Sequence, residues 1–174
     1  MVWTPRVTVA AVIERDGKFL VIEEDTDDGL RLNQPAGHLE AGESLENAVT
    51  RETLEETAHP FIPSGWLGTY LWRPEGADAP TFLRFAFVGE AGEPLPGRAL
   101  DEGIRRAFWI STNELRARQA EHRSPLVMRC VDDYLRARAS GRPWLALDAL
   151  RPSDRLRLFE MHPTEIDTLV GNLE

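Results

Sequence analysis

The spacing of apolar residues along the chain predicts a succession of short strands and helices. Runs rich in valine, isoleucine and aromatic residues, bounded by glycine, proline or acidic residues, are typical of strands. Such runs predict strands over residues 6–14, 18–24, 66–72, 81–88 and 105–110. Strict alternation in 81–88 indicates a strand whose two faces differ, with Arg84 on the face opposite the one carrying Phe85.

Turn residues separate these strands. Asp16-Gly17 favours a type I′ hairpin between the first two strands. Polar or Gly/Pro-rich composition predicts loops over residues 24–29, 73–80 and 89–98.

Three helices are predicted from their apolar stripes and their first residues. The first lies in the segment 37–58, where a Gly-rich turn leads into the helix and Ser44 is its N-cap. The second begins at Ser111, where Glu114 completes a capping-box spacing. The third begins at Ser124 with Pro125 in its first turn and ends at Gly141. Its stripe, expected to face the sheet, consists of Val127, Val131, Tyr134 and Leu135.

Strands and helices in this order predict an α/β (α+β) fold, a mixed α/β sandwich. We expect one domain over residues 1–147. Residues 148–174 are charged and proline-containing, and predict a C-terminal extension with a short helix near 153–160.

The composition of the chain argues against some classes of binding partner. The net charge is −9 and no basic cluster is present, which argues against a nucleic-acid backbone as partner. The single cysteine, Cys130, excludes an intramolecular disulfide. We find no signal peptide and no apolar run as long as a membrane span, so we expect a cytoplasmic protein without a membrane partner, as a monomer or a homodimer.

The first predicted helix contains the candidate functional residues. Its apolar stripe at Leu45, Ala48 and Val49 continues into carboxylates at Glu52, Glu55 and Glu56. Like charges at such spacings repel, and partial burial increases the cost. A hard divalent cation such as Mg²⁺ would offset the repulsion between these carboxylates. The alternative is an ordinary acidic, solvated helix face.

The spacing of these acids resembles the Nudix box. Gly37 is followed after five residues by Glu43, after seven more by Arg51-Glu52, and after two more by Glu55-Glu56. Three structural positions depart from that motif: Thr53 replaces an aliphatic residue, Ala58 the second glycine and His59 the last aliphatic residue. Without glycine at position 58 we expect Pro60 to stop the helix.

The resemblance implies a Nudix-type α/β/α sandwich with a mixed central sheet over residues 6–140, and hydrolysis of a phosphoanhydride. The implied metal ligands are the Gly37 carbonyl, Glu52, Glu55 and Glu56, for Mg²⁺ or alternatively Mn²⁺. Arg51 and Glu43 would brace them. The general base is a box glutamate or an outside acid, for which Asp101-Glu102 is our candidate; the alternative is that this pair is solvated. Glu90 and Glu93 are weaker candidates.

Substrate contacts are assigned with a structural alternative for each. Arg84 either contacts a phosphate or pairs with an acid. Trp72 and Arg73 either stack on a base of the substrate, or Trp72 belongs to the core or its rim. Gln34 either forms a hydrogen bond with the substrate or anchors the turn in which it lies. The helix that opens at His122, Arg123 and Ser124 could attract phosphate, but capping explains Ser124 better. His38 and His59 are interpreted as structural.

Four runs resemble the NudJ phosphatase branch of the family: VTVAAVIERDGKFLVIEE, NQPAGHLEAGESL, TFLRFAFV and RSPLV. That branch implies a small phosphorylated substrate, namely hydroxymethylpyrimidine pyrophosphate, a thiamine precursor, or a nucleoside tri- or diphosphate, with release of orthophosphate. Two alternatives stay open. One is a hydrolase of dinucleoside polyphosphates or nucleotide sugars, and the other is a non-catalytic nucleotide-binding module.

Overall fold

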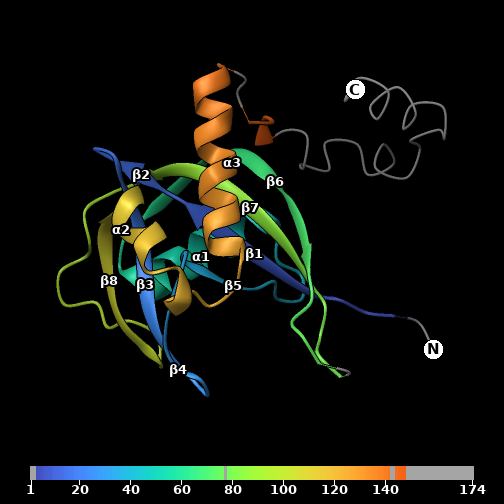
Figure 1. The fold of residues 1–174 in the computed structure, drawn as a ribbon. Helices are drawn as coiled ribbons and strands as arrows, with labels where there is room; N and C mark the ends of the chain where they lie inside the picture. The colour runs from blue at the N-terminus through green and yellow to red at the C-terminus, as the bar shows by residue number, and fades with distance from the viewer. Residues whose placement is uncertain (1–2, 77, 142–143, 148–174) are drawn as a thin grey trace, which may run out of the picture.

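In the part of the chain that the structure describes, the strands form a mixed sheet and an antiparallel sheet (Figure 1). The computed structural model describes residues 3–76, 78–141 and 144–147. The first sheet has the order β5-β1-β7-β6, comprising Ala36–His38, Arg6–Val12, Phe82–Ala91 and Phe61–Trp72. Its β1 and β7 run parallel, and its other pairs are antiparallel.

The second sheet is antiparallel and centred on β3. Its strands are β2 (Glu14–Arg15), β3 (Lys18–Thr26), β4 (Gly29–Asn33) and β8 (Ile104–Ser111). Asp16 and Gly17 both have positive φ, at 51° and 76°, as the predicted type I′ turn requires.

The helices cover two different faces of the first sheet. Alternate residues of β1 divide between two apolar clusters: Val9 and Ala11 pack with Val49 of α1 (Leu45–Thr57), whereas Val12 packs with Val127 of α3 (Leu126–Ser140). The short α2 (Thr112–Ala117) and a 3₁₀ turn, η1 (Gln119–Glu121), connect β8 to α3. The predicted mixed α/β sandwich is therefore confirmed.

Several predicted boundaries are wrong. The loop predicted over 24–29 is a tight turn, because β3 continues to Thr26 and β4 begins at Gly29, whose φ is 92°. Strand β6 begins at Phe61, five residues earlier than predicted. The strand can contain Pro63 because this proline lies at an irregularity of the pairing with β7. The same pairing extends β7 to Ala91, into the loop predicted over 89–98.

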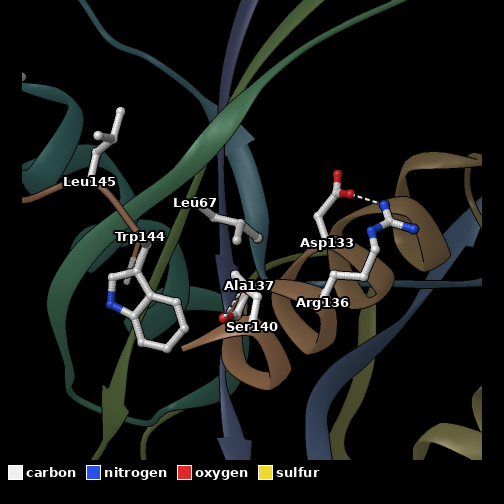
Figure 2. A pocket seen from close by; sticks show the side chains of 7 residues that line it. All are labelled: Leu67, Asp133, Arg136, Ala137, Ser140, Trp144 and Leu145. Carbon is white, nitrogen blue, oxygen red and sulfur yellow. Dashed lines mark hydrogen bonds and ion pairs between the residues drawn. The ribbon is translucent and has the colours of Figure 1, made fainter. Parts of the chain in front are cut away.

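The chain returns to the first sheet after α3. Trp144 stacks on Tyr134 with ring centroids 5.3 Å apart, and Leu145 exchanges two backbone hydrogen bonds with Trp66. Trp144 and Leu145 line a pocket together with Leu67 of β6 and Ser140 of α3 (Figure 2). Gly65 makes this packing feasible, since a Cβ there would lie 1.9 Å from Trp144 Cδ1. Leu147 also packs against the apolar cluster that contains Val49. The predicted short helix at 153–160 and the extension 148–174 lie outside the described residues.

No helix among the described residues is long and apolar enough to cross a membrane.

Candidate active site

Helix α1 begins as predicted but ends differently. The Ser44 hydroxyl accepts a hydrogen bond from the Asn47 amide at 3.1 Å. At the other end Ala58 itself adopts the left-handed conformation, with φ 59°, and its N–H donates to the Leu54 carbonyl at 3.0 Å. Ala58 therefore forms the left-handed cap that glycine would provide in the motif, and Pro60 follows two residues after this cap. A non-glycine residue in this conformation costs roughly 1–2 kcal/mol, which the surrounding packing must offset.

The two polar replacements near this end are both satisfied. Thr53 is fully buried and donates its hydroxyl to the Val49 carbonyl at 2.7 Å. His59 lies with Nδ1 2.6 Å from the Gly92 carbonyl oxygen and packs edge-on against Trp109. The structural interpretation of His59 agrees with these contacts.

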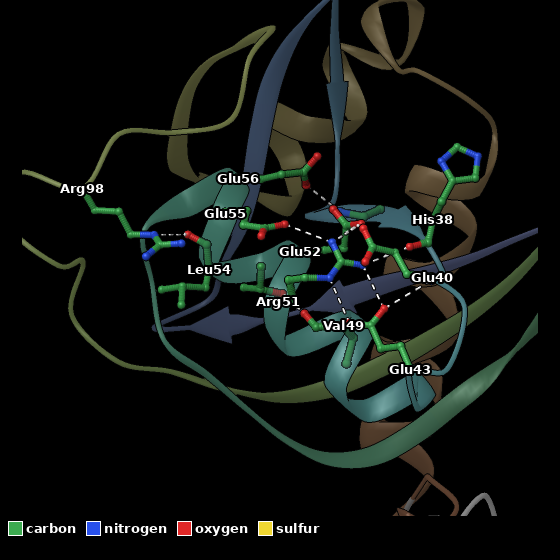
Figure 3. A network of polar contacts seen from close by, with 12 residues as sticks. His38, Glu40, Glu43, Val49, Arg51, Glu52, Leu54, Glu55, Glu56 and Arg98 are labelled. Atoms are coloured by element: carbon green, nitrogen blue, oxygen red, sulfur yellow. Dashed lines mark hydrogen bonds and ion pairs between the residues drawn. The ribbon is translucent and has the colours of Figure 1, made fainter.

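Arg51 organises the acids around it (Figure 3). Its guanidinium donates to Glu43 through two nitrogens, at 2.9 and 3.0 Å, and to Glu52 and Glu55 at 2.9 and 3.0 Å. A further bond of 3.1 Å reaches the His38 carbonyl and ties the helix to β5. One cation therefore holds three carboxylates and the preceding loop in a single network.

Glu52 and Glu56 face a cavity of about 510 Å³ at the ends of β1, β5 and β7. Each is 8% exposed. Glu56 accepts a hydrogen bond from the Ala36 amide at 2.7 Å. A Cβ at Gly37 would lie 2.0 Å from the Glu52 carboxyl carbon, so glycine is needed for this carboxylate to lie against β5.

Burial makes both carboxylates costly to ionise. It raises the pKa of Glu52 and raises the pKa of Glu56 to about 9; the charges of Glu52, Glu24 and Asp101 add to the shift of Glu56. The hydrogen bond from the Ala36 amide acts in the opposite direction and lowers the pKa of Glu56. A cation in the cavity would favour the charged forms of both groups.

Beyond the carboxylates, the cavity has a polar floor and an aromatic wall. Thr8, Asn33, Arg84 and Ser124 line it, and each has at least one buried polar atom without a hydrogen-bond partner in the described part of the chain. Trp72 and Phe82 stack with centroids 5.6 Å apart and line it from the side. A cavity with carboxylates, buried donors and a flat aromatic surface can accommodate a small phosphorylated ring compound.

Comparisons with known proteins agree with this geometry. The NUDIX domain family matches residues 4–130. The chain belongs to the Nudix hydrolase family. Phosphatase NudJ from Escherichia coli K12 is 39% identical over 130 residues, which is 75% of this chain and 83% of that protein. Nudix hydrolases generally use divalent metal ions.

Solved structures share the fold. A NUDIX hydrolase from Nitrosomonas europaea is 49% identical, with a TM-score of 0.78 over 87% of this chain and 99% of that one. The solution structure of the E. coli ORF135 protein is 21% identical with a TM-score of 0.62, covering 87% and 96%, and shows the likeness of fold alone.

The donor set of the Nudix box fits a hard cation only in part as it stands. Glu52, Glu56 and the backbone of Gly37 line one cavity and offer oxygen atoms, which suit Mg²⁺ or Mn²⁺. Glu55 instead lies beside Arg51 and does not line this cavity. Within residues 3–76, 78–141 and 144–147, no three acids, histidines or cysteines are close enough to enclose a metal.

The other predicted contacts divide between the cavity and its surroundings. Arg84 and Trp72 line the cavity, but Gln34 does not: it is 2% exposed and its Nε2 donates to the Val127 carbonyl at 2.7 Å. This bond agrees with the anchoring alternative. Arg73 lies on an exposed loop, where it donates to the Gly76 carbonyl at 3.4 Å.

The acids proposed as an external base are all exposed and away from the cavity lining. Of the pair at 101–102, Asp101 is tied to α1, because its N–H donates to the Glu55 carbonyl at 3.0 Å and its charge acts on Glu56. Glu102 has neither connection in the described structure. Glu90 is exposed and Glu93 pairs with Arg15.

The sequence interpretation missed Thr8, Glu24 and Asn33 as residues of the cavity, and it considered Arg123 only as part of a helix opening. Thr8 could have been found, because it lies directly across the β1–β7 ladder from Arg84. Asn33 donates to Glu24 at 3.2 Å, across the β3–β4 hairpin whose turn was mispredicted as a loop.

Proposed function

We propose that this Nudix hydrolase uses Mg²⁺ to hydrolyse a phosphoanhydride bond in a small substrate, either hydroxymethylpyrimidine pyrophosphate or a nucleoside tri- or diphosphate. The observation that carries the proposal is the single cavity that joins two buried carboxylates of the Nudix box to a buried arginine. The likeness to phosphatase NudJ supports the choice of substrate.

Each side chain has a role in this proposal. Glu52, Glu55, Glu56 and the Gly37 carbonyl would hold the metal, which when bound polarises a phosphoryl oxygen and makes water a better nucleophile. Arg51 and Glu43 position the carboxylates. Trp72 provides a flat surface for the ring of the substrate. A box glutamate or a water-linked Asp101 or Glu102 would take the proton of the attacking water.

A substrate panel tests this function. The panel contains hydroxymethylpyrimidine pyrophosphate, nucleoside tri- and diphosphates, nucleotide sugars and dinucleoside polyphosphates, each with Mg²⁺ or with EDTA. We expect orthophosphate release from the first two classes, only with the metal. Preferred cleavage of a nucleotide sugar or dinucleoside polyphosphate would replace the proposed substrate, and binding without turnover of any compound would indicate a non-catalytic module.

Metal binding should also raise thermal stability. A ligand that binds only the folded protein at about 100 times its Kd stabilises it by about 2.7 kcal/mol. For a domain of this size that corresponds to a rise in Tm of roughly 5–10 °C. We expect such a rise with millimolar Mg²⁺, measured by differential scanning calorimetry against Na⁺ at equal ionic strength. Equal Tm values in the two salts would contradict a magnesium site.

Other parts of the proposal concern the protein as a whole. We propose a cytoplasmic enzyme that acts as a monomer or homodimer, without nucleic acid or membrane as partner. The boundary at residues 147 and 148 between the catalytic domain and the C-terminal extension is likewise a prediction.

A further inference from the structure

Arg84 is a buried arginine that has no ion-pair partner among the described residues. It lies on β7, is 8% exposed and lines the active-site cavity. Its Nε and Nη1 atoms are buried and have no hydrogen-bond partner within the described chain. Glu24 and Glu56 act on its charge over a distance, but neither forms a hydrogen bond with it. A guanidinium stays charged, and burying it unpaired is costly, so its position calls for an anion.

Two hydroxyls in the same cavity also have no hydrogen-bond partner among the residues that the structure describes. Thr8 lies opposite Arg84 on β1, and its Oγ1 is buried without a hydrogen bond. Ser124 is 5% exposed, and its Oγ is buried without a hydrogen bond as well. Both hydroxyls can donate to a ligand oxygen.

The start of α3 completes this part of the cavity. We predicted that Ser124 caps this helix, which is wrong: Pro125 occupies the N-cap position and no side chain caps it. Leu126, the first helical residue, lines the cavity beside Ser124. The N-terminal end of this 15-residue helix carries partial positive charge and is suited to an anion.

We propose that Arg84, Ser124, Thr8 and the uncapped start of α3 form an anion subsite for a phosphoryl group of the substrate, separate from the carboxylates that would hold the metal. The inference rests on the proposed function, because it places one phosphoryl group of that substrate. Arg84 carries a positive charge, the Thr8 and Ser124 hydroxyls can donate, and the start of α3 carries partial positive charge, which together suit the acceptor oxygens of a phosphoryl group.

The chemistry of the subsite favours an anion over a neutral ring. A heterocycle could accept hydrogen bonds from Arg84 but would leave its charge uncompensated, whereas the stacked Trp72 and Phe82 offer a ring a better surface. A terminal phosphate carries more charge than one esterified at both ends. The subsite therefore selects substrates with a free terminal phosphate over nucleotide sugars.

Binding of orthophosphate and pyrophosphate to the metal-free protein tests the subsite. The protein is kept in EDTA, affinity is measured by titration calorimetry, and ¹⁵N amide shifts of Ser124 and Leu126 report the location. We expect orthophosphate to shift both amides. Arg84→Met should weaken binding by about tenfold or more and Ser124→Ala by about threefold, as expected for lost charged and neutral hydrogen bonds. Arg84→Lys should weaken it less than Arg84→Met.

The matched control for Arg84→Met is Arg136→Met, which removes an exposed arginine of α3 that pairs with Asp133 and does not line the cavity. It should bind orthophosphate like the wild type. Unchanged affinity in folded Arg84→Met would overturn the proposal. If that variant fails to fold, Ser124→Ala decides: unchanged affinity and an unchanged Leu126 shift overturn the proposal equally.

A third result would also overturn it. If an unphosphorylated nucleoside or hydroxymethylpyrimidine, and not orthophosphate, shifts the Leu126 amide, this end of the cavity binds the ring. Neither metal nor turnover enters these measurements. A failed hydrolysis panel therefore leaves the subsite standing, and a failed phosphate titration leaves the hydrolase proposal standing.

Discussion

Replacing Glu56 by glutamine should lower turnover by roughly 10³-fold, equivalent to about 4 kcal/mol of activation free energy, while the protein stays folded. The glutamine has nearly the same shape, and its carbonyl oxygen can still accept the hydrogen bond that the Ala36 amide donates to Glu56 at 2.7 Å. It lacks the negative charge that a metal ligand in this cavity requires.

The metal-free variant should be at least as stable as the wild type. Burial raises the pKa of Glu56 to about 9, which means that the charged carboxylate is disfavoured in the folded protein. A neutral amide at the same position avoids this cost. With millimolar Mg²⁺ the order should reverse, because the wild type gains more from the ion. Thus Tm measured with and without Mg²⁺ separates loss of a ligand from loss of the fold.

Glu46→Gln is the control for this change. Glu46 lies in the first turn of the same helix and does not line the cavity, so the substitution removes an equal charge away from the site. It should keep the activity of the wild type. Activity of Glu56→Gln within about threefold of the wild type would remove Glu56 from the mechanism and with it the proposed ligand set.

The helix with the acids could be predicted because its signals are local. Ser44 and the stripe from Leu45 to Glu56 follow from spacing within one helix, and the structure buries Glu52 and Glu56 accordingly. The same periodicity did not separate Glu55, which lies beside Arg51 instead of in the cavity. Side-chain pairing depends on which neighbour is nearer, and helical spacing alone does not determine it.

The floor of the cavity could not be predicted because its residues come from distant segments. Thr8, Arg84 and Ser124 meet only after β1 pairs with β7 and α3 packs against them. The strand pattern places Arg84 on one face but does not say whether an acid lies opposite. Ser124-Pro125 looks like a capped helix start, yet the chain uses Pro125 as the N-cap and leaves the Ser124 hydroxyl in the cavity.

Replacing Arg51 by methionine should destabilise the metal-free protein by about 3 kcal/mol, because it leaves Glu43, Glu52 and Glu55 without their shared cation. This estimate lies at the low end for buried pairs, since the Arg51 side chain is 25% exposed and water screens part of the interaction. The corresponding fall in Tm is roughly 6–12 °C. Arg51→Lys keeps the charge but not the forked donors, so its stability should lie between those of the wild type and Arg51→Met.

Arg116→Met is the control, since Arg116 forms one exposed pair with Asp132, of 52% and 32% side-chain exposure, and its loss should cost at most about 1 kcal/mol. Urea denaturation at low salt gives the free energies of unfolding. Mg²⁺ should restore part of the stability of Arg51→Met, because the freed Glu55 can then turn toward the ion. A loss in Arg51→Met no larger than in Arg116→Met would show that the three carboxylates do not depend on Arg51, and their arrangement would need another cause.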